Sequence, residues 1–142
     1  MAAHPAELAH RYAVALDRKD IDALVGLFVP AIRDKVRAQL APAIGRLGVT
    51  VLSVTTQTVD LVDDDHATGV VYCTAEVDDP DEGWIRQQIV YQDRYERVGE
   101  GWWFRARDHQ LVYGVHLPEN PLDQPAADWP RHQVGRGTYP PE

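Results

Sequence analysis

Two aspartates, Asp93 and Asp108, lie in neighbouring segments that the sequence predicts to be paired strands. Residues opposite each other in an antiparallel pair share one face of the sheet, so pairing Arg97 with Trp102 across the turn sets the register. This register gathers four polar residues on one face: Tyr91, Asp93, Asp108 and Gln110. Isolated carboxylates are costly to bury, so two of them opposite a helical layer indicate a solvated cavity suited to acid–base chemistry. The alternative is an open sheet end at which both acids pair with arginines.

The same register predicts the other side chains of this inward face. We expect four of them to line the cavity: Gln87, Ile89, Trp102 and Phe104. Arg107 and His109 fall on the outward face, where they form an anion site or, more commonly, a solvated or dimer-contact surface. A register shifted by one residue would mix apolar and charged side chains on both faces, which disfavours it.

The elements that position these residues follow from periodicity and turn signals. Apolar residues at helical spacing predict a helix from Pro5 to Leu16 and a second one, capped by Asp20, that ends before Pro30. A third helical segment, 32–44, contains Pro42, so we expect a kink or two short helices. Segments rich in β-branched and aromatic residues then predict four antiparallel strands, at 49–62, 66–78, 84–97 and 102–113. This order indicates an α+β domain in which helices cover one face of a curved sheet.

Composition excludes several functional classes. The 142 residues are 44% hydrophobic and carry a net charge of −8, which is typical of a folded soluble protein. An acidic chain without clustered Lys and Arg argues against a nucleic-acid partner. No apolar run is long enough to cross a membrane, and the first residues do not resemble a secretion signal, so we expect a cytoplasmic protein.

The end of the chain differs from the rest. Six of the ten prolines lie in the last 29 residues. We therefore expect one domain at 1–113 and a proline-rich tail at 114–142 that packs on the domain or on a partner subunit, with a mostly disordered tail as the alternative.

Other kinds of chemistry find little support. The six histidines show no metal-ligand spacing, and the single cysteine, Cys73, reads as a small core residue. There is no glycine-rich phosphate loop. We expect neither a metal nor a cofactor.

Four stretches carry a resemblance to a known family. They are Tyr12–Leu24 in the helices, Asp65–Gly69 at the start of a strand, Tyr91–Arg97 before the last turn, and Trp102–Phe104 with Arg107 and His109 after it. In order and spacing, residues 5–113 resemble the SnoaL-like branch of the nuclear transport factor 2-like superfamily, which includes scytalone dehydratase, ketosteroid isomerase and polyketide cyclases. The resemblance implies a cone-shaped α+β fold and pairing of two copies through the sheet.

The resemblance also implies roles for two helical residues. In dehydratases of this kind, an acid at the end of the first helix works with strand histidines to remove a proton and expel water. Asp17 stands at the position of that acid, and Tyr12 matches a tyrosine of bile acid dehydratase-like members. The histidine positions fall near 52–53 and 70–71, where this chain has no histidine. Alternatively, Asp17 caps the helix end beside Lys19.

Three functions follow as hypotheses. The first is a cofactor-free lyase, isomerase or cyclase acting on an apolar polycyclic or polyketide-like substrate, with Asp17 as the acid–base group. Tyr12 and Tyr91 would then polarise a substrate oxygen, and Asp93 or Asp108 would be the second carboxylate. The second is a binding protein for a small apolar ligand, and the third is a structural domain with a filled cone that dimerises through its sheet.

Overall fold

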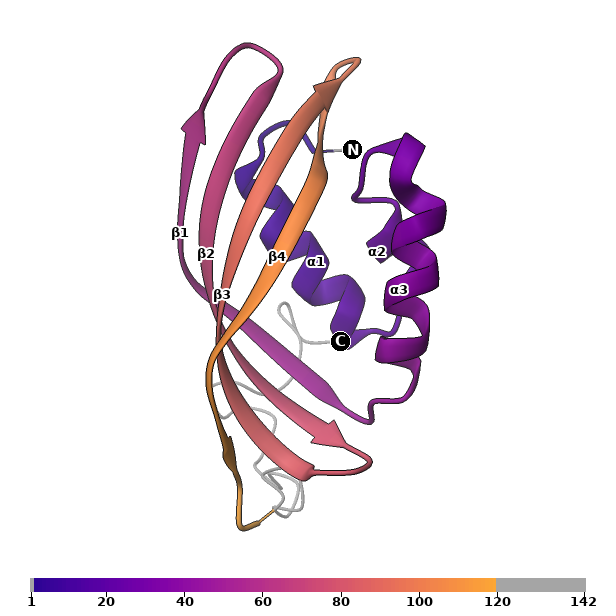
Figure 1. The fold of residues 1–142 in the computed structure, drawn as a ribbon, viewed down its shortest axis with the longest axis vertical. Coiled ribbons are helices and arrows are strands. Elements are labelled where there is room, and N and C mark those ends of the chain that lie inside the picture. Colours follow the sequence, from indigo (N-terminus) through magenta and orange to yellow (C-terminus); the bar gives the residue numbers. More distant parts are fainter. Residues whose placement is uncertain (1, 120–142) are drawn as a thin grey trace, which may run out of the picture.

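Helices precede strands along the chain, and Figure 1 shows the helices packed against one side of a long twisted sheet. The computed structural model describes residues 2–119, so the predicted tail beyond Glu119 lies outside the described residues. The predicted α+β class and the antiparallel order of strands are confirmed. The last strand, β4 (Gly101–His116), is longer than predicted and continues to His116.

The helical layer has four pieces. They are α1 (Ala6–Asp17), α2 (Ile21–Val25), the short 3₁₀ helix η1 (Pro30–Ile32) and α3 (Arg33–Gly45). Leu8, Tyr12 and Leu16 recur at helical spacing and are buried, which fixes the face that α1 turns toward the sheet. The Asp20 carboxylate accepts a hydrogen bond from the Ala23 N–H and so caps α2, as predicted.

Of the two alternatives predicted for the third helical segment, a kink or two short helices, the second is wrong, because α3 runs through Pro42 as one continuous helix. Proline removes one N–H donor from a helix, and the carbonyl left without that donor is four residues earlier, at Ala38. Ala38 and Pro42 are both exposed, so water can satisfy the free carbonyl at little cost.

The sheet is a four-stranded antiparallel meander in the order β1 (Thr50–Leu61), β2 (His66–Asp79), β3 (Gly83–Val98) and β4. A tight turn joins β3 to β4, and Gly99 has a φ of +66° there, a conformation that glycine adopts without a steric penalty. Near this turn the structure confirms the predicted register, with Arg97 opposite Trp102 and Tyr95 opposite Phe104.

The register then changes at a β-bulge in β4. Arg94 lies opposite Ala106, so Arg105 is an extra residue without a partner on β3. Because side chains alternate between the two faces of a strand, one extra residue exchanges the faces of the residues that follow it, here up to Leu111. A second unpaired residue, Val112, then restores the original alternation. Past the bulge, Asp93 lies opposite Arg107 and Tyr91 lies opposite His109.

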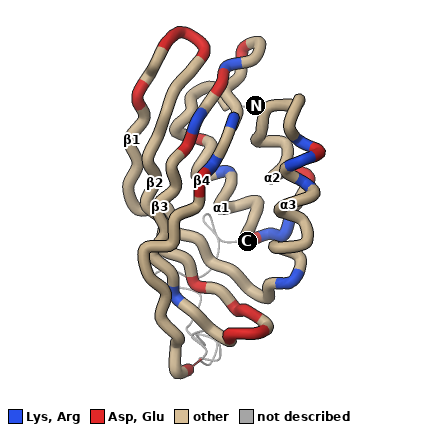
Figure 2. The backbone as a smooth tube through the Cα atoms, in the orientation of Figure 1, with Lys and Arg blue, Asp and Glu red and all other residues tan. Residues whose placement is uncertain are grey.

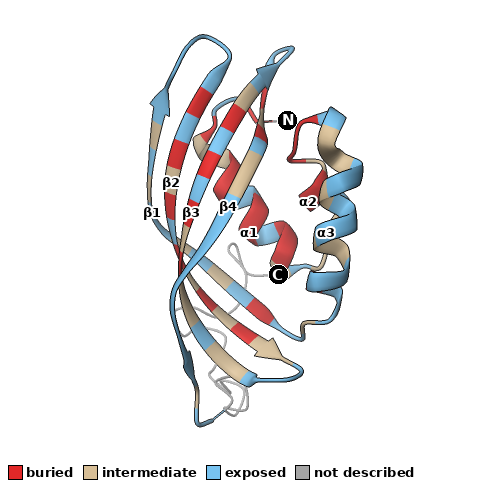
Figure 3. Ribbon diagram, in the orientation of Figure 1, coloured by how far each residue is buried: buried red, intermediate tan, exposed pale blue. Residues whose placement is uncertain are grey.

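Figure 3 shows buried residues alternating with more exposed ones along β2 and β3. The β3–β4 end of the cone is packed solid with aromatic side chains, namely Phe28, Tyr95, Trp102 and Phe104. Backbone hydrogen bonds from Trp102 to Ala2 and between Phe104 and the segment after α2 cover the edge of β4 at this end. The opposite end of the curved sheet, toward His116 on β4, is less covered by other elements.

Charges are unevenly distributed, as Figure 2 shows: acidic residues gather at the β1–β2 and β2–β3 turns, whereas basic residues lie on α3 and in the middle of β4. Among residues 2–119, no helix has the length and apolarity needed to cross a membrane.

Candidate functional site

The centre of the inner face holds a buried ion pair. Arg107 on β4 donates two hydrogen bonds to the Asp93 carboxylate on β3, from Nε at 2.9 Å and from Nη2 at 3.1 Å. The Arg107 side chain is 4% exposed and that of Asp93 is not exposed at all. Asp93 faces inward as predicted, and Arg107 lies on the same face because of the bulge at Arg105. The expected outward placement of Arg107 is therefore wrong. Of the alternative, an open sheet end at which both acids pair with arginines, only the pairing is found, and only for Asp93, which is buried.

Three aromatic rings surround the Arg107 guanidinium. Its Cζ atom lies 3.8 Å from the ring centre of Tyr91, 4.4 Å from that of Tyr12 and 4.7 Å from that of Phe104. Cations are attracted to the faces of aromatic rings, and the attraction is stronger where water is excluded. The rings thus help to offset the cost of burying the guanidinium, and they hold it in one orientation.

Tyr95 completes the coordination of Asp93. Its hydroxyl donates a hydrogen bond of 3.0 Å to Oδ2 of the carboxylate. Burial raises the pKa of the Asp93 carboxyl, an effect that the Arg107 guanidinium opposes. With its oxygens bound by Arg107 and Tyr95, Asp93 is a structural partner of Arg107 more than a free second carboxylate for substrate.

Gly69 makes room for the Tyr95 ring. A Cβ atom at Gly69 would lie 2.6 Å from the Tyr95 hydroxyl and 2.8 Å from Cε2 of the ring. We expect Gly69→Ala to lower the free energy of unfolding by about 1–3 kcal/mol, because the buried ring has no space into which to move. Urea unfolding measures the change. Gly114→Ala in β4 is the matched control and should be nearly neutral, because the nearest atom to its Cβ is 3.9 Å away. Equal stability of the two variants would contradict this account.

Two cavities flank the ion pair and its aromatic rings. One, of about 200 Å³, lies between α1, α3 and the inner face of the sheet and is lined by Leu16, Thr50, Gln87 and Ile89. The other is a cleft of about 560 Å³ between α3 and β4. Tyr12, Tyr91 and His109 line both of them, so these three residues mark the junction. Burial raises the pKa of Tyr12 and of Tyr91, which keeps both hydroxyls protonated and able to donate.

His109 is a site residue that the sequence-based register placed on the wrong face. It lies opposite Tyr91 in the sheet, and the two rings meet edge-to-face with centroids 5.3 Å apart. His109 remains exposed. The sequence does contain a signal for His109. A buried Asp93 needs a cationic partner, and a register that turns Arg107 inward to supply it also turns His109 inward.

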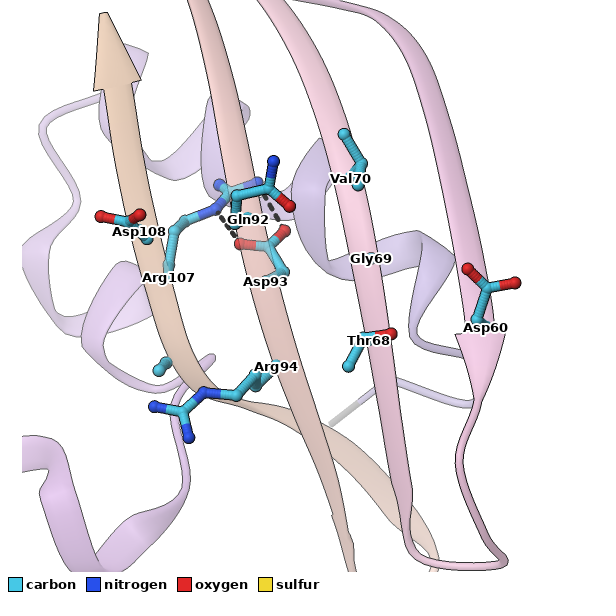
Figure 4. A pocket seen from close by; sticks show the side chains of 10 residues that line it. Asp60, Thr68, Gly69, Val70, Gln92, Asp93, Arg94, Arg107 and Asp108 are labelled. Atoms are coloured by element: carbon cyan, nitrogen blue, oxygen red, sulfur yellow. Dashed lines mark hydrogen bonds and ion pairs between the residues drawn. The ribbon is translucent and has the colours of Figure 1, made fainter.

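The expected inward placement of Asp108 and Gln110 is wrong for the same reason. Both residues follow the bulge, so they lie on the outer face, where the Gln110 amide donates to Asp108 at 3.2 Å. Figure 4 shows the Asp108 side chain pointing away from the dashed contacts between Arg107 and Asp93. The hollow drawn there, of about 390 Å³, is a depression in the outer face beside Gly69.

The sequence profile of the SnoaL-like domain matches residues 6–108, which is most of the chain. The chain belongs to the SnoaL-like domain family. A comparison with curated proteins finds no match.

Solved structures show the same fold as this SnoaL-like domain. LinA is 16% identical, with a TM-score of 0.71 over 78% of this chain and 85% of that one. A candidate scytalone dehydratase from Novosphingobium aromaticivorans is 19% identical, with a TM-score of 0.68 over 80% and 85% of the two chains. A hexachlorocyclohexane dehydrochlorinase, LinA-type3 from Novosphingobium barchaimii, is 15% identical, with a TM-score of 0.66 over 78% and 86%. These likenesses establish the nuclear transport factor 2-like fold.

Within this SnoaL-like domain, the predicted pocket residues fall into two groups. Gln87 and Ile89 line the smaller cavity, together with Tyr12 and Tyr91. Trp102 and Phe104 belong to the packed core, where Phe104 lies against Arg107.

Asp17 lies at the end of α1 beside the start of β1. Its carboxylate accepts hydrogen bonds from the Leu52 N–H, at 3.1 and 3.2 Å, and from the Thr50 hydroxyl at 3.0 Å. Lys19, at a φ of 57°, donates to the same hydroxyl at 2.9 Å. Asp17 is not among the residues that line the cavities of this SnoaL-like domain, whereas Thr50 lines the smaller one. Asp17 is therefore connected to that cavity only indirectly, through its hydrogen bond with the Thr50 hydroxyl.

The described part of this SnoaL-like domain contains no group of three or more His, Cys, Asp or Glu side chains able to hold a metal ion. The groups available for chemistry at the junction are the His109 imidazole, two tyrosine hydroxyls and the Arg107 guanidinium.

Proposed function

We propose that the protein is a cofactor-free lyase or isomerase that transfers a proton on a small, largely apolar, polycyclic or polyketide-like substrate bound in the cone. The observation that carries this proposal is the position of His109, on the inner face beside Tyr91, where the two cavities meet. An imidazole is the side chain best suited to proton transfer near neutral pH.

The proposed reaction begins with transfer of a proton from a substrate carbon, next to a carbonyl, to an imidazole nitrogen of His109. The electrons of the broken C–H bond move onto the carbonyl oxygen, and the Tyr12 and Tyr91 hydroxyls stabilise that oxygen by donating hydrogen bonds. Return of the proton at another carbon gives isomerisation. Departure of a group from the next carbon gives elimination, with His109 delivering the proton to the leaving group.

The names of two structural neighbours support this class of reaction. A dehydratase removes water, and a dehydrochlorinase removes hydrogen chloride, so both names denote an elimination. In this chain we assign the proton transfer to a histidine on β4, since the histidines expected by resemblance near 52–53 and 70–71 are not present. Asp17 is then a positioning residue, which orients Thr50 at the wall of the smaller cavity.

The test is proton exchange followed by NMR. The purified protein would be incubated in D₂O with a panel of cyclic ketones, with and without a hydroxyl group on the β-carbon. We expect deuterium to enter the carbon next to the carbonyl, and the β-hydroxy compounds to lose water. Absence of both exchange and product across the panel, in protein that still binds panel members, would favour a non-catalytic binding protein. One observation favours this second candidate. The Asp17 carboxylate accepts hydrogen bonds from the Leu52 N–H and is not among the residues that line the cavities.

We also propose that two copies associate through the outer face of the sheet. Val51 on β1, Tyr72 on β2, and Tyr113 and Val115 on β4 are 43–55% exposed on that face. Light scattering should give twice the chain mass, and Tyr72→Glu should give the mass of one chain.

A further inference from the structure

We propose that the cleft between α3 and β4 selects substrates in which an apolar ring system bears a carboxylate, and that Arg107 and Arg105 bind this group. This inference rests on the proposed function and narrows its substrate class.

The two walls of the cleft differ in chemistry. The α3 side contributes Ile32, Val36 and Leu40, which are apolar and partly buried. The β4 side contributes the charged and polar side chains of Arg105, Arg107, Asp108 and His109. A molecule that satisfies both walls has an apolar body and a hydrogen-bond acceptor or negative charge on one side.

Arg107 is held ready to donate. Its Nε and Nη2 bind Asp93, whereas its Nη1 makes no hydrogen bond to any residue that the structure describes. The rings of Tyr12, Tyr91 and Phe104 fix the guanidinium plane. A donor that is already immobilised loses little entropy when a ligand binds, which favours affinity. Replacing a buried ion pair with apolar residues often leaves stability unchanged. Stability alone therefore does not explain a buried cation at this position, whereas a ligand-binding role does.

Arg105 supplies positive charge that is only weakly neutralised. As the bulge residue, it has no partner on β3, and its side chain is 48% exposed. Its Nε lies 3.6 Å from Glu96 Oε2, a longer contact than those between Arg107 and Asp93. The other acid at the cleft, Asp108, lies on the outer face and accepts a hydrogen bond from Gln110. Asp93 neutralises Arg107, and Asp108 balances Arg105 in number, so the cleft offers a ligand anion two guanidinium donors and no excess of positive charge.

The proposed binding mode fits the proposed chemistry. With the carboxylate on the two arginines and the ring against α3, the body of the molecule extends toward Tyr12, Tyr91 and His109, which line the same cleft. The arginines then orient the substrate, and His109 is left free to transfer a proton.

The experiment uses two probes that differ only in the charged group. Calorimetry would compare 2-naphthoate, an anion, with the neutral 2-naphthalenemethanol. We expect naphthoate to bind at least about tenfold more tightly, as a charge-assisted hydrogen bond implies. Arg105→Gln should weaken naphthoate binding about fivefold and leave the neutral probe unaffected.

Two variants of α3 locate the site. Gln39 lines the cleft and its neighbour Ala38 does not, although both are exposed. Gln39→Trp should therefore abolish naphthoate binding, whereas Ala38→Trp should leave it unchanged. Equal affinity for the two probes, binding of neither, or insensitivity to Gln39→Trp would each overturn the inference.

The naphthoate titration and the ketone panel, both run on the wild-type protein, separate this inference from the proposed function. If the cleft binds naphthoate but no substrate is converted, the proposed function fails and the ligand class stands. If ketones are converted while naphthoate does not bind, the ligand class fails alone.

Discussion

Replacing Arg107 with methionine is expected to lower the free energy of unfolding by about 3–5 kcal/mol. The substitution keeps much of the side-chain volume, but it leaves the Asp93 carboxylate buried with only the Tyr95 hydroxyl as a partner. It also removes the cation on which three aromatic rings pack. Urea unfolding followed by tryptophan fluorescence gives the stability of each variant.

Two controls decide whether the loss comes from the unpaired charge. The double variant Arg107→Met, Asp93→Leu should be more stable than Arg107→Met alone, because it no longer buries a lone carboxylate. Arg86→Met removes a comparable contact to Glu76 on the exposed outer face, and it should stay within about 1 kcal/mol of the wild type. Additive effects of the two core substitutions would show that the pair is not coupled.

His109→Gln is expected to reduce kcat/KM by roughly a hundred- to ten-thousand-fold for any substrate found in the ketone panel. Glutamine fills similar space and forms hydrogen bonds, but it cannot accept a proton near neutral pH. Because His109 is exposed and makes no hydrogen bond within residues 2–119, the melting temperature should hardly change.

The matched control is His116→Gln. His116 lies on the same strand and contacts Glu82 at 3.0 Å, remote from the junction of the cavities. Turnover should survive this change. If His109→Gln retained full kcat/KM, proton transfer would have to be assigned to another group, and the measurement would then be repeated with Tyr91→Phe.

Much of the fold was predictable because it depends on local residue patterns that can be read from the sequence. Alternation and turn residues predicted the four strands, and helical spacing predicted α1 and the cap at Asp20. The register next to the tight β3–β4 turn was predictable because few residues separate the pairs from the turn that fixes them.

The site was less predictable, since its composition depends on one unpaired residue. Nothing in the local pattern around Arg105 marks a bulge, because apolar and charged residues alternate without a break from Phe104 to Arg107. Tyr12 and Tyr91 were identified because they lie on α1 and β3, which the bulge in β4 does not affect. His109 was missed because it lies beyond the bulge.

The bulge at Arg105 means that β4 carries two alternative sets of pocket residues within one sequence. In the present register the strand turns a guanidinium and an imidazole toward the helices, and an acid and an amide toward the outer face. Loss of a single codon at this position would exchange the two sets without altering any helix. A family built on such a strand could change the chemistry of its cavity through one short deletion, more readily than through several coordinated substitutions.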